Sequence, residues 1–181
     1  MKDRIIKKSI ELFNEFGCKF SMEALSKALS ISKKTLYKYF SSKEELISYI
    51  INESFNEVHE KQNSIYQSDL SLEMKLREIL TTNFAREDSI KMENTKDIKL
   101  YYPTLALKIE DRYREEWTLV KNLLIEGRNL GLFDYWSLSY LIEIMQEAMS
   151  LVILHLDGTI SYQKAIDITM NSIVDIIKRK K

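Results

Sequence analysis

The chain is poor in the residues that turns require. Its 181 residues include four glycines and one proline, whereas average composition would supply roughly 20 of these two types together. Hairpins and sandwiches need Gly and Pro at their turns, so this deficit argues against a fold rich in β-structure. It favours long helices joined by short connections, and the sequence therefore predicts an all-α protein.

Cysteine and long apolar runs are also scarce. Cys18 is the one cysteine, so no intrachain disulfide is possible and nothing indicates an oxidising compartment. The longest strongly apolar stretch, 148–156, contains a serine and a histidine. It is about half the length of the ~20 residues that span a bilayer. We therefore expect a soluble, cytoplasmic protein without a membrane partner.

The residues that would mark a metal site or an enzyme are missing too. His59 and His155 are the two histidines, and neither follows an acidic residue by three positions, so a Glu-x-x-His di-metal site is unsupported. The four glycines stand too far apart for a phosphate-binding loop. No nucleophile and base stand out as a pair. We expect no catalytic residue, no metal and no cofactor, and hence not an enzyme.

The first 46 residues predict a compact head of short helices. An amphipathic helix over 3–16 precedes Gly17, and Ser21 can cap a second helix over 22–29. A third helix runs over 33–40 after a turn of three or four residues. These are the proportions of a helix-turn-helix, and they define a predicted DNA-binding domain, 1–46.

The predicted second domain, 47–181, is larger. Ser42 and Glu45 form a capping box for a long helix that extends to about Tyr66. Pro103 breaks the chain after a polar stretch, 86–99, that is hard to assign. The remaining apolar periodicity predicts helices over 71–84, 104–130, 137–157 and 161–178, which gives about nine helices in the whole chain.

The third helix has an outward face suited to DNA. Leu36 and Phe40 can pack inward, which leaves Lys33, Lys34, Tyr37 and Lys38 outside, with Thr35 and Tyr39 beside them. Lysines neutralise phosphates, and hydroxyl groups bind phosphate oxygens or base edges. The alternative is an ordinary solvated lysine face. Lys43, at the start of the next helix, opposes the helix dipole, and a nearby phosphate would explain its presence.

The segment from Ile5 to Leu46 resembles the N-terminal domain of the TetR/AcrR family of transcriptional regulators. The matching residues are 12–17 (LFNEFG), 24–28 (ALSKA), 31–40 (ISKKTLYKYF) and 43–46 (KEEL). The resemblance implies that Thr35, Tyr37 and Tyr39 contact DNA, that Lys43 binds a phosphate, and that a hydroxyl near Ser21 does the same. The predicted DNA-binding set is Ser21, Lys33, Lys34, Thr35, Tyr37, Lys38, Tyr39 and Lys43.

Three residues depart from the family pattern. Ser30 stands in the turn where the family usually has Gly, so a left-handed conformation there would cost more. Lys34 replaces a small residue and adds a positive charge. Met22 replaces a Thr or Ser that would bind phosphate.

The last two helices are apolar on more than one face, which predicts more than one packing partner. In the last helix, Ile166, Ile173 and Ile177 belong to one stripe, whereas Ile168 and Ile176 belong to another. The preceding helix has a second stripe of Ile144, Ala148 and Leu151. We prefer a homodimeric four-helix interface, which the resemblance also implies, over two buried helices in a monomer. The predicted interface residues are Leu141, Met145, Met149, Val152, Ile166, Ile173 and Ile177.

The resemblance further implies an effector pocket within about 71–157. Aromatic and methionine side chains suit an adaptable apolar cavity. The alternative for each of them is a place in the ordinary core. The candidates are Phe84, Tyr101, Tyr102, Tyr113, Trp117, Met145 and Met149.

The resemblance implies a repressor that binds a pseudo-palindromic, double-stranded operator at the nucleoid and is released by a small, largely apolar effector. One alternative is a DNA-binding regulator whose second domain only dimerises or binds a partner. The least favoured alternative is an all-helical enzyme that reuses the fold.

The chain has a net charge of zero, but its positive and negative charges are distributed unevenly along the sequence. Residues 1–50 carry a balance of +4, and residues 51–181 carry −4. We therefore expect DNA to meet the basic head, while like-charge repulsion disfavours contact with the rest.

Overall fold

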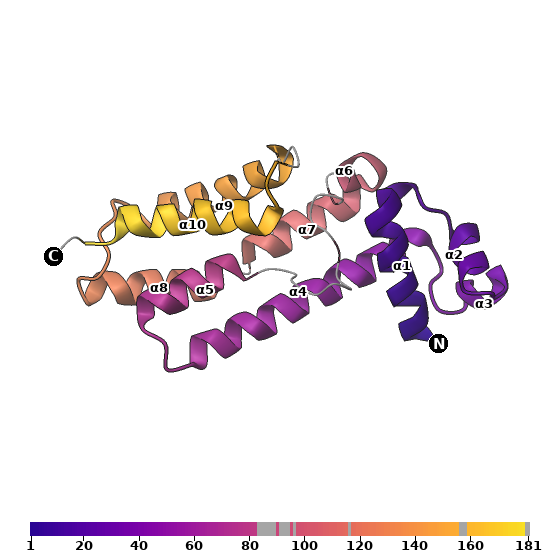
Figure 1. The fold of residues 1–181 in the computed structure, drawn as a ribbon, viewed down its shortest axis with the longest axis horizontal. Helices are drawn as coiled ribbons and strands as arrows, with labels where there is room; N and C mark the ends of the chain where they lie inside the picture. The colour runs from indigo at the N-terminus through magenta and orange to yellow at the C-terminus, as the bar shows by residue number, and fades with distance from the viewer. Residues whose placement is uncertain (83–89, 91–94, 96, 116, 156–158, 180–181) are drawn as a thin grey trace. The chain divides into compact units, whose positions relative to one another are not determined.

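The computed structural model describes residues 1–82, 90, 95, 97–115, 117–155 and 159–179. These residues form ten α-helices and one 3-10 helix (Figure 1), against about nine helices expected. Their single β-bridge joins Phe133 to Lys178. The all-α fold predicted from the lack of Gly and Pro is confirmed.

The chain forms two compact units. Unit 1 comprises Met1–Glu57 and Phe84–Ile109, and unit 2 comprises Val58–Asn83 and Glu110–Lys181. These units describe how the chain packs. A functional boundary between residues 46 and 47 stays a prediction.

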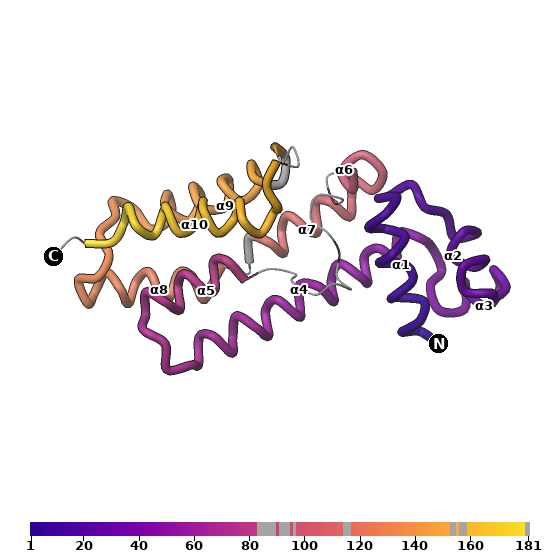
Figure 2. Tube along the Cα trace, viewed as in Figure 1, coloured from indigo at the N-terminus to yellow at the C-terminus, as the bar shows by residue number. Residues whose placement is uncertain are grey.

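Unit 1 contains the predicted head. It holds α1 (Lys2–Phe16), the 3-10 helix η1 (Gly17–Lys19), α2 (Met22–Ala28) and α3 (Lys33–Tyr37). It also holds the first part of α4 (Lys43–Gln67), the four-residue α6 (Ile98–Tyr101) and the start of α7 (Pro103–Glu115). The tube in Figure 2 follows the three short helices from the N-terminus through α3.

Serine side chains cap the N-termini of α2, α3 and α4. Ser21 Oγ accepts a hydrogen bond from the Ala24 amide at 3.0 Å, and Ser32 Oγ accepts one from the Thr35 amide at 3.0 Å. Ser42 Oγ accepts one from the Glu45 amide at 3.0 Å. The Glu45 carboxylate accepts a hydrogen bond from the Ser41 amide at 2.7 Å, whereas the predicted capping box would use the Ser42 amide as the donor.

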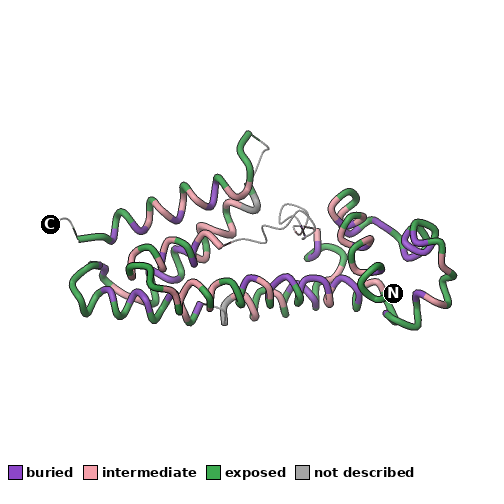
Figure 3. Tube along the Cα trace, turned by 60° about the horizontal axis from the view of Figure 1, so that its bottom comes forward, coloured by how far each residue is buried: buried purple, intermediate pink, exposed green. Residues whose placement is uncertain are grey.

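The core of the head consists of fully buried apolar side chains from each helix. Phe13, Leu25, Leu36, Phe40 and Leu46 are all buried. Figure 3 shows buried, intermediate and exposed positions alternating along the helices. Helix α3 ends at Tyr37, three residues before the predicted end, although the Phe40 amide still donates to the Leu36 carbonyl at 3.2 Å.

Unit 2 packs its helices around one apolar core. It contains the rest of α4, α5 (Leu72–Thr81), the end of α7, α8 (Thr118–Asn129), α9 (Leu138–His155) and α10 (Tyr162–Ile177). Helices α5, α8, α9 and α10 contact one another in this unit. Gly127 of α8 allows the close approach of Phe133, because a Cβ on Gly127 would lie 2.2 Å from that ring.

The long helix predicted over 104–130 is wrong, since the structure has α7 and α8 there instead. Trp117 is the N-cap of α8, with φ −87° and ψ 10°. Its side chain is buried in the core of unit 2. The sequence has neither Gly nor Pro at this break, and its apolar periodicity therefore predicted one continuous helix.

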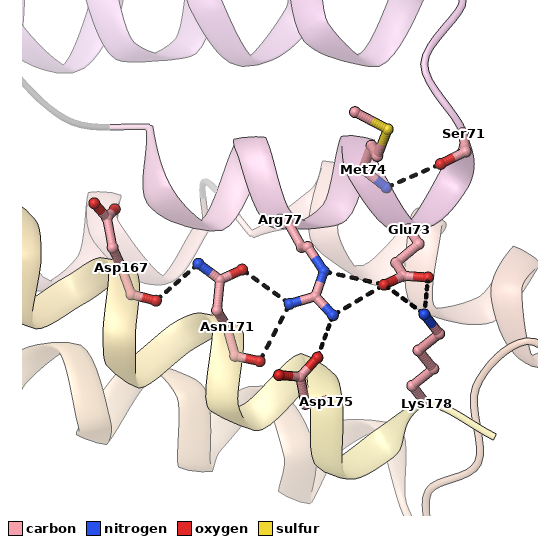
Figure 4. A network of polar contacts seen from close by, with 8 residues as sticks. All are labelled: Ser71, Glu73, Met74, Arg77, Asp167, Asn171, Asp175 and Lys178. Carbon is pink, nitrogen blue, oxygen red and sulfur yellow. Dashed lines mark hydrogen bonds and ion pairs between the residues drawn. The ribbon is translucent and has the colours of Figure 1, made fainter. Parts of the chain in front are cut away.

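A network of hydrogen bonds and ion pairs connects α5 to α10 (Figure 4). Arg77 Nη2 donates to Glu73 Oε1 at 2.9 Å, and Arg77 Nη1 donates to Asn171 Oδ1 at 2.9 Å. Arg77 also pairs with Asp175. Lys178 Nζ lies 2.8 Å from Glu73 Oε2. One arginine therefore connects three side chains on two helices.

Candidate nucleic-acid interface

Helix α3, the second helix of the predicted helix-turn-helix and called the recognition helix from here on, has the two-sided character that the sequence predicted. Leu36 is completely buried, and Phe40 is nearly so. On the other side, 46% of Tyr37 and 41% of Tyr39 is exposed. Lys33, Lys34 and Lys38 are exposed as well. Cations and phenolic hydroxyls therefore share one short segment whose inner residues are fixed by the core.

The turn between α2 and α3 is tight and left-handed. Ser30 has φ 54°, the single positive φ outside glycine among the described residues. Its amide donates to the Lys27 carbonyl at 3.0 Å, and the Ile31 amide donates to the Ser26 carbonyl at 3.0 Å. The structure thus has at Ser30 the conformation for which glycine is the usual residue.

Lys33 is the one recognition-helix lysine for which the structure defines an acidic partner. Its Nζ lies 2.9 Å from Glu23 Oε2 on α2, and Lys27 Nζ lies 3.1 Å from Glu23 Oε1. Hydrogen bonds from Lys33 and then Lys27 hold the pKa of Glu23 below its usual value. No motif of the sequence marks Glu23 as part of the site, although its spacing of four residues from Lys27 indicates one of the two pairs.

The two hydroxyl candidates cap helices in the head. Ser21 is exposed at the N-cap of α2, and its oxygen already accepts the Ala24 amide. The Thr35 hydroxyl lies 2.9 Å from the Ser32 hydroxyl, and Thr35 is half-buried. Each retains hydrogen-bonding capacity, because a hydroxyl has one donor and two acceptor positions.

Lys43 differs from the other lysines of the predicted set. It is half-buried, and its Nζ donates to the Cys18 carbonyl at 2.6 Å. The same ammonium group lies 4.6 Å from the centroid of the Phe20 ring. In the structure this charge lies among groups of the head itself, and its predicted role at a DNA phosphate stays a prediction.

The candidate effector residues are distributed over both units. Tyr101 and Tyr102 belong to unit 1, and Phe84 lies outside the described residues. Unit 2 brings together Tyr113, Trp117 and Met149. The rings of Tyr113 and Trp117 meet edge to face at 6.0 Å, and the Tyr113 hydroxyl donates to Met149 Sδ at 3.0 Å.

Tyr113 is the most chemically specific member of this cluster. Burial is the main cause of a strongly raised pKa at its hydroxyl, which therefore stays protonated. A thioether is a weak acceptor, so this partly buried donor would gain from a stronger one. Met145 is completely buried in the same core. Met145 therefore occupies a place in the ordinary core, which was the alternative to a place in the lining of an effector pocket.

The predicted interface residues lie toward the core of unit 2. Leu141, Met145, Ile166 and Ile177 are buried there, and Met149, Val152 and Ile173 pack against it.

The exposed apolar residues of α9 and α10 lie at other positions. We call them the exposed stripe: Tyr140, Ile144, Leu151, Ile168 and Ile176. None of the five is a predicted interface residue. Ile144 and Leu151 of α9, and Ile168 and Ile176 of α10, belong instead to the second apolar stripes that the sequence shows on these helices.

Neither a membrane span nor a metal cluster was found in the described part of the chain. Among those residues, no helix combines the length and apolarity needed to cross a bilayer. The same residues hold no group of three or more His, Cys, Asp or Glu side chains arranged for a metal ion.

Known proteins resemble this chain in sequence and in fold. Residues 5–50 match the sequence profile of bacterial regulatory proteins of the tetR family. The uncharacterized HTH-type transcriptional regulator YvaF of Bacillus subtilis (strain 168) is 29% identical over 127 residues, which cover 70% of this chain and 67% of YvaF.

Two solved structures show the similarity in fold. The TetR family regulator PfmR from Thermus thermophilus has a TM-score of 0.76 at 21% identity, covering 98% of this chain and 100% of PfmR. FadR from Bacillus subtilis, in complex with stearoyl-CoA, has a TM-score of 0.77 at 15% identity, covering 98% of this chain and 100% of FadR.

Proposed function

We propose that this chain, which is a DNA-binding transcriptional regulator of the TetR family, acts as a homodimeric repressor at a pseudo-palindromic operator. The family is non-enzymatic, so the expectation that the chain is not an enzyme is confirmed. The observation that carries the proposal is the outer face of α3 and of the turn that follows it, where Tyr37, Tyr39 and the lysines are exposed while Leu36 and Phe40 are buried.

The proposed contacts divide between reading bases and binding the DNA backbone. Tyr37 and Thr35 are the candidates for base edges, because α3 is the second helix of the helix-turn-helix and enters the major groove. Lys34, Lys38 and Lys33 bind phosphates, with Ser21 and Tyr39 adding hydroxyl contacts. The operator lies in the cytoplasm, where the regulator would act.

Selection of bound DNA from a random pool tests this assignment. The expected result is an inverted repeat whose half-sites are spaced by one helical turn, because a two-fold protein reads two half-sites. Recovery of unrelated sequences, with no enriched motif, would contradict sequence-specific binding.

We propose that the exposed stripe on α9 and α10 forms the dimer interface. Ile168 is 54% exposed and Ile176 is 80% exposed, although the other face of α10 is buried in the core of unit 2. Burial of such side chains against a second copy is worth about 25 cal/mol for each Å² of apolar surface. A second copy is the favoured occupant because one short recognition helix reads too few bases for a specific site.

The finer proposal is an apolar effector that binds in unit 2 beside Tyr113, Trp117 and Met149. These side chains offer an aromatic and thioether surface with one protonated hydroxyl donor. An apolar molecule that carries a carbonyl acceptor fits this chemistry. The stearoyl-CoA bound to the structurally similar FadR suggests long-chain acyl-CoA as the first probe. Release requires that the effector bind more tightly to the conformation with weak operator affinity.

The two tryptophans allow a direct test. Trp117 is buried at 5% exposure beside Tyr113, whereas Trp136 is 95% exposed. In a Trp136→Phe variant, the fluorescence reports Trp117 alone. Stearoyl-CoA should change this fluorescence and release operator DNA, while free coenzyme A should do neither. If stearoyl-CoA and other apolar compounds leave both signals unchanged, the alternative of a body used only for dimerisation or partner binding is favoured.

A further inference from the structure

The first two turns of α1 carry a concentration of positive charge that the proposed DNA contacts do not use. Residues 2–8 contain four basic side chains and one acidic side chain, whereas residues 9–16 contain two acidic side chains and no basic one. Arg4 and Lys7, near the start of α1, and Glu15, near its end, are all exposed. The outer face of α1 is therefore basic at one end and acidic at the other.

This order of charges is the reverse of the order that the helix dipole favours. Acidic side chains stabilise the N-terminus of a helix and basic side chains stabilise its C-terminus. Arg4 lies in the first turn of α1, and Glu15 lies in the last turn, which has no basic residue. Lys8 follows Arg4 by four residues, a spacing at which like charges repel. The stability of the helix does not explain this order, whereas an anionic partner at the basic end would.

The basic end of α1 lies beside the segment that follows the recognition helix (Figure 1). Lys2 Nζ lies 4.0 Å from the centroid of the Tyr49 ring and 5.8 Å from that of the Phe40 ring. These two rings pack edge to face at 5.5 Å. Phe40 directly follows Tyr39, an exposed residue of the proposed DNA interface. The first turn of α1 therefore borders that interface.

Arg4 and Lys7 are the cations of this end that project into solvent. Ile5, which lies between them in sequence, is completely buried, so α1 is held in a fixed rotation about its axis. Lys8 Nζ lies 2.6 Å from Glu11 Oε2. Neither Arg4 nor Lys7 forms an ion pair within the described part of the chain. Both charges are therefore available to an anion outside the protein.

We propose that Arg4 and Lys7 bind phosphates of the operator backbone beside the groove that α3 enters, which adds α1 to the DNA interface. The second helix of a helix-turn-helix enters the major groove, so neighbouring elements of the head meet the phosphates along its edges. Arginine and lysine are the side chains that most often bind such phosphates, and these contacts carry no sequence information. The inference rests on the DNA-binding function of the head.

The salt dependence of operator binding measures these contacts. Each phosphate neutralised by a cation contributes about 0.9 to the slope of log K against log salt concentration. The double variant Arg4→Gln, Lys7→Gln should reduce the slope by about 1.8 for each head on the DNA, and operator affinity should fall about tenfold or more in dilute salt. Each single replacement should give half of the change in slope. The double variant Arg4→Lys, Lys7→Arg keeps both charges and should retain the wild-type slope.

A matched control separates a local contact from the change in net charge. Lys61 of α4 and Lys121 of α8 are exposed cations of unit 2. Lys61→Gln with Lys121→Gln therefore removes two positive charges outside the head and should leave the slope near the wild-type value. An unchanged slope in Arg4→Gln, Lys7→Gln, or an equal reduction in this control, would overturn the proposal.

A contact with the backbone should weaken binding to all operators alike. Relative affinities for operators with single base changes should therefore be the same in Arg4→Gln, Lys7→Gln as in the wild type. A changed order of preference would contradict the phosphate role. Failure of the wild type to bind any selected operator would instead refute the proposed function.

Neutralising single phosphates of the operator locates the contacts. A methylphosphonate removes the charge of one phosphate, so at least one position in each half-site should weaken binding of the wild type but not of the double variant. The melting temperature of the double variant should not fall, because both replacements are exposed and Gln is a good helix former. If every methylphosphonate weakens both proteins by the same factor, α1 does not bind the backbone.

Discussion

Lys33 of the recognition helix is paired with Glu23 of α2 at 2.9 Å, across the turn of the helix-turn-helix. Both side chains are about half exposed, so water and salt screen the pair. A DNA phosphate can therefore displace Glu23 from Lys33. The Glu23 carboxylate also adds a negative charge close to the phosphates that these lysines are proposed to bind.

Replacing this carboxylate should strengthen DNA binding. Glu23→Gln leaves Lys33 without its ionic partner and removes a charge that repels phosphate. We expect operator affinity to rise by roughly two- to fivefold at low salt, and the gain to shrink as salt increases. Fluorescence anisotropy over a range of salt concentrations measures this. Glu126→Gln, at an exposed position of α8, makes the same change in net charge. An equal gain in both variants would attribute the effect to net charge alone.

Tyr37 should be essential for specific binding but not for folding. Tyr37→Ala removes a half-exposed side chain, so the melting temperature should change little. Operator affinity should fall by roughly 10- to 100-fold, the range for loss of one base contact. Tyr37→Phe separates the hydroxyl from the ring. Equal operator affinity of Tyr37→Ala and the wild type, in the same binding assay, would exclude Tyr37 from the interface.

A charge in the exposed stripe should break the proposed dimer. Ile168→Glu would require an ionised carboxylate to be buried between two copies, which is strongly unfavourable. Light scattering at micromolar concentration should report a monomer, and operator affinity should fall. Met74→Glu is the matched control, because Met74 of α5 is similarly exposed but lies outside the stripe. A dimeric Ile168→Glu protein would refute the assignment.

The network around Glu73 should make unit 2 sensitive to acid. Its hydrogen bond from Lys178 is the largest cause of a pKa below the ordinary 4.5, and Arg77 lowers it further. Because the folded-state pKa is depressed, the stabilisation is fully present above pH 4.5 and is lost as the pH falls through the lower, folded-state value.

The matching variant is Glu73→Gln. We expect it to lower the free energy of unfolding by about 1 kcal/mol at neutral pH and to reduce the loss of stability below pH 4.5. Urea denaturation at several pH values measures both effects. Parallel stability curves for the two proteins across this range would show that Glu73 does not contribute to the acid sensitivity.

Ser30 offers a stabilising substitution. Its φ of 54° lies in the left-handed region, where a side chain costs about 1–2 kcal/mol. Ser30→Gly should relieve part of this cost and raise the melting temperature, despite the greater freedom of glycine in the unfolded state. Ser30→Ala keeps a Cβ and should not stabilise the protein. A gain of similar size in both variants would assign the effect to the hydroxyl and not to the backbone.

The sequence by itself determined the class of fold and the character of the head. The scarcity of Gly and Pro predicted an all-helical fold. Ser21 and Ser42 indicated helix starts, and in the structure both serines cap a helix. The apolar spacing of Leu36 and Phe40 predicted which side of the recognition helix is buried. These features are local, because a cap or a helical period depends on residues within one or two turns.

Only the tertiary structure decided which of two apolar faces is exposed in α9 and α10. Both stripes have helical spacing, so sequence alone does not tell the face toward the core, with Met145 and Ile166, from the face with Ile144 and Ile168. The same holds for Lys43, whose partner Cys18 is 25 residues away. Local patterns carry no information about such partners, because the folded chain brings them together through packing of the whole unit.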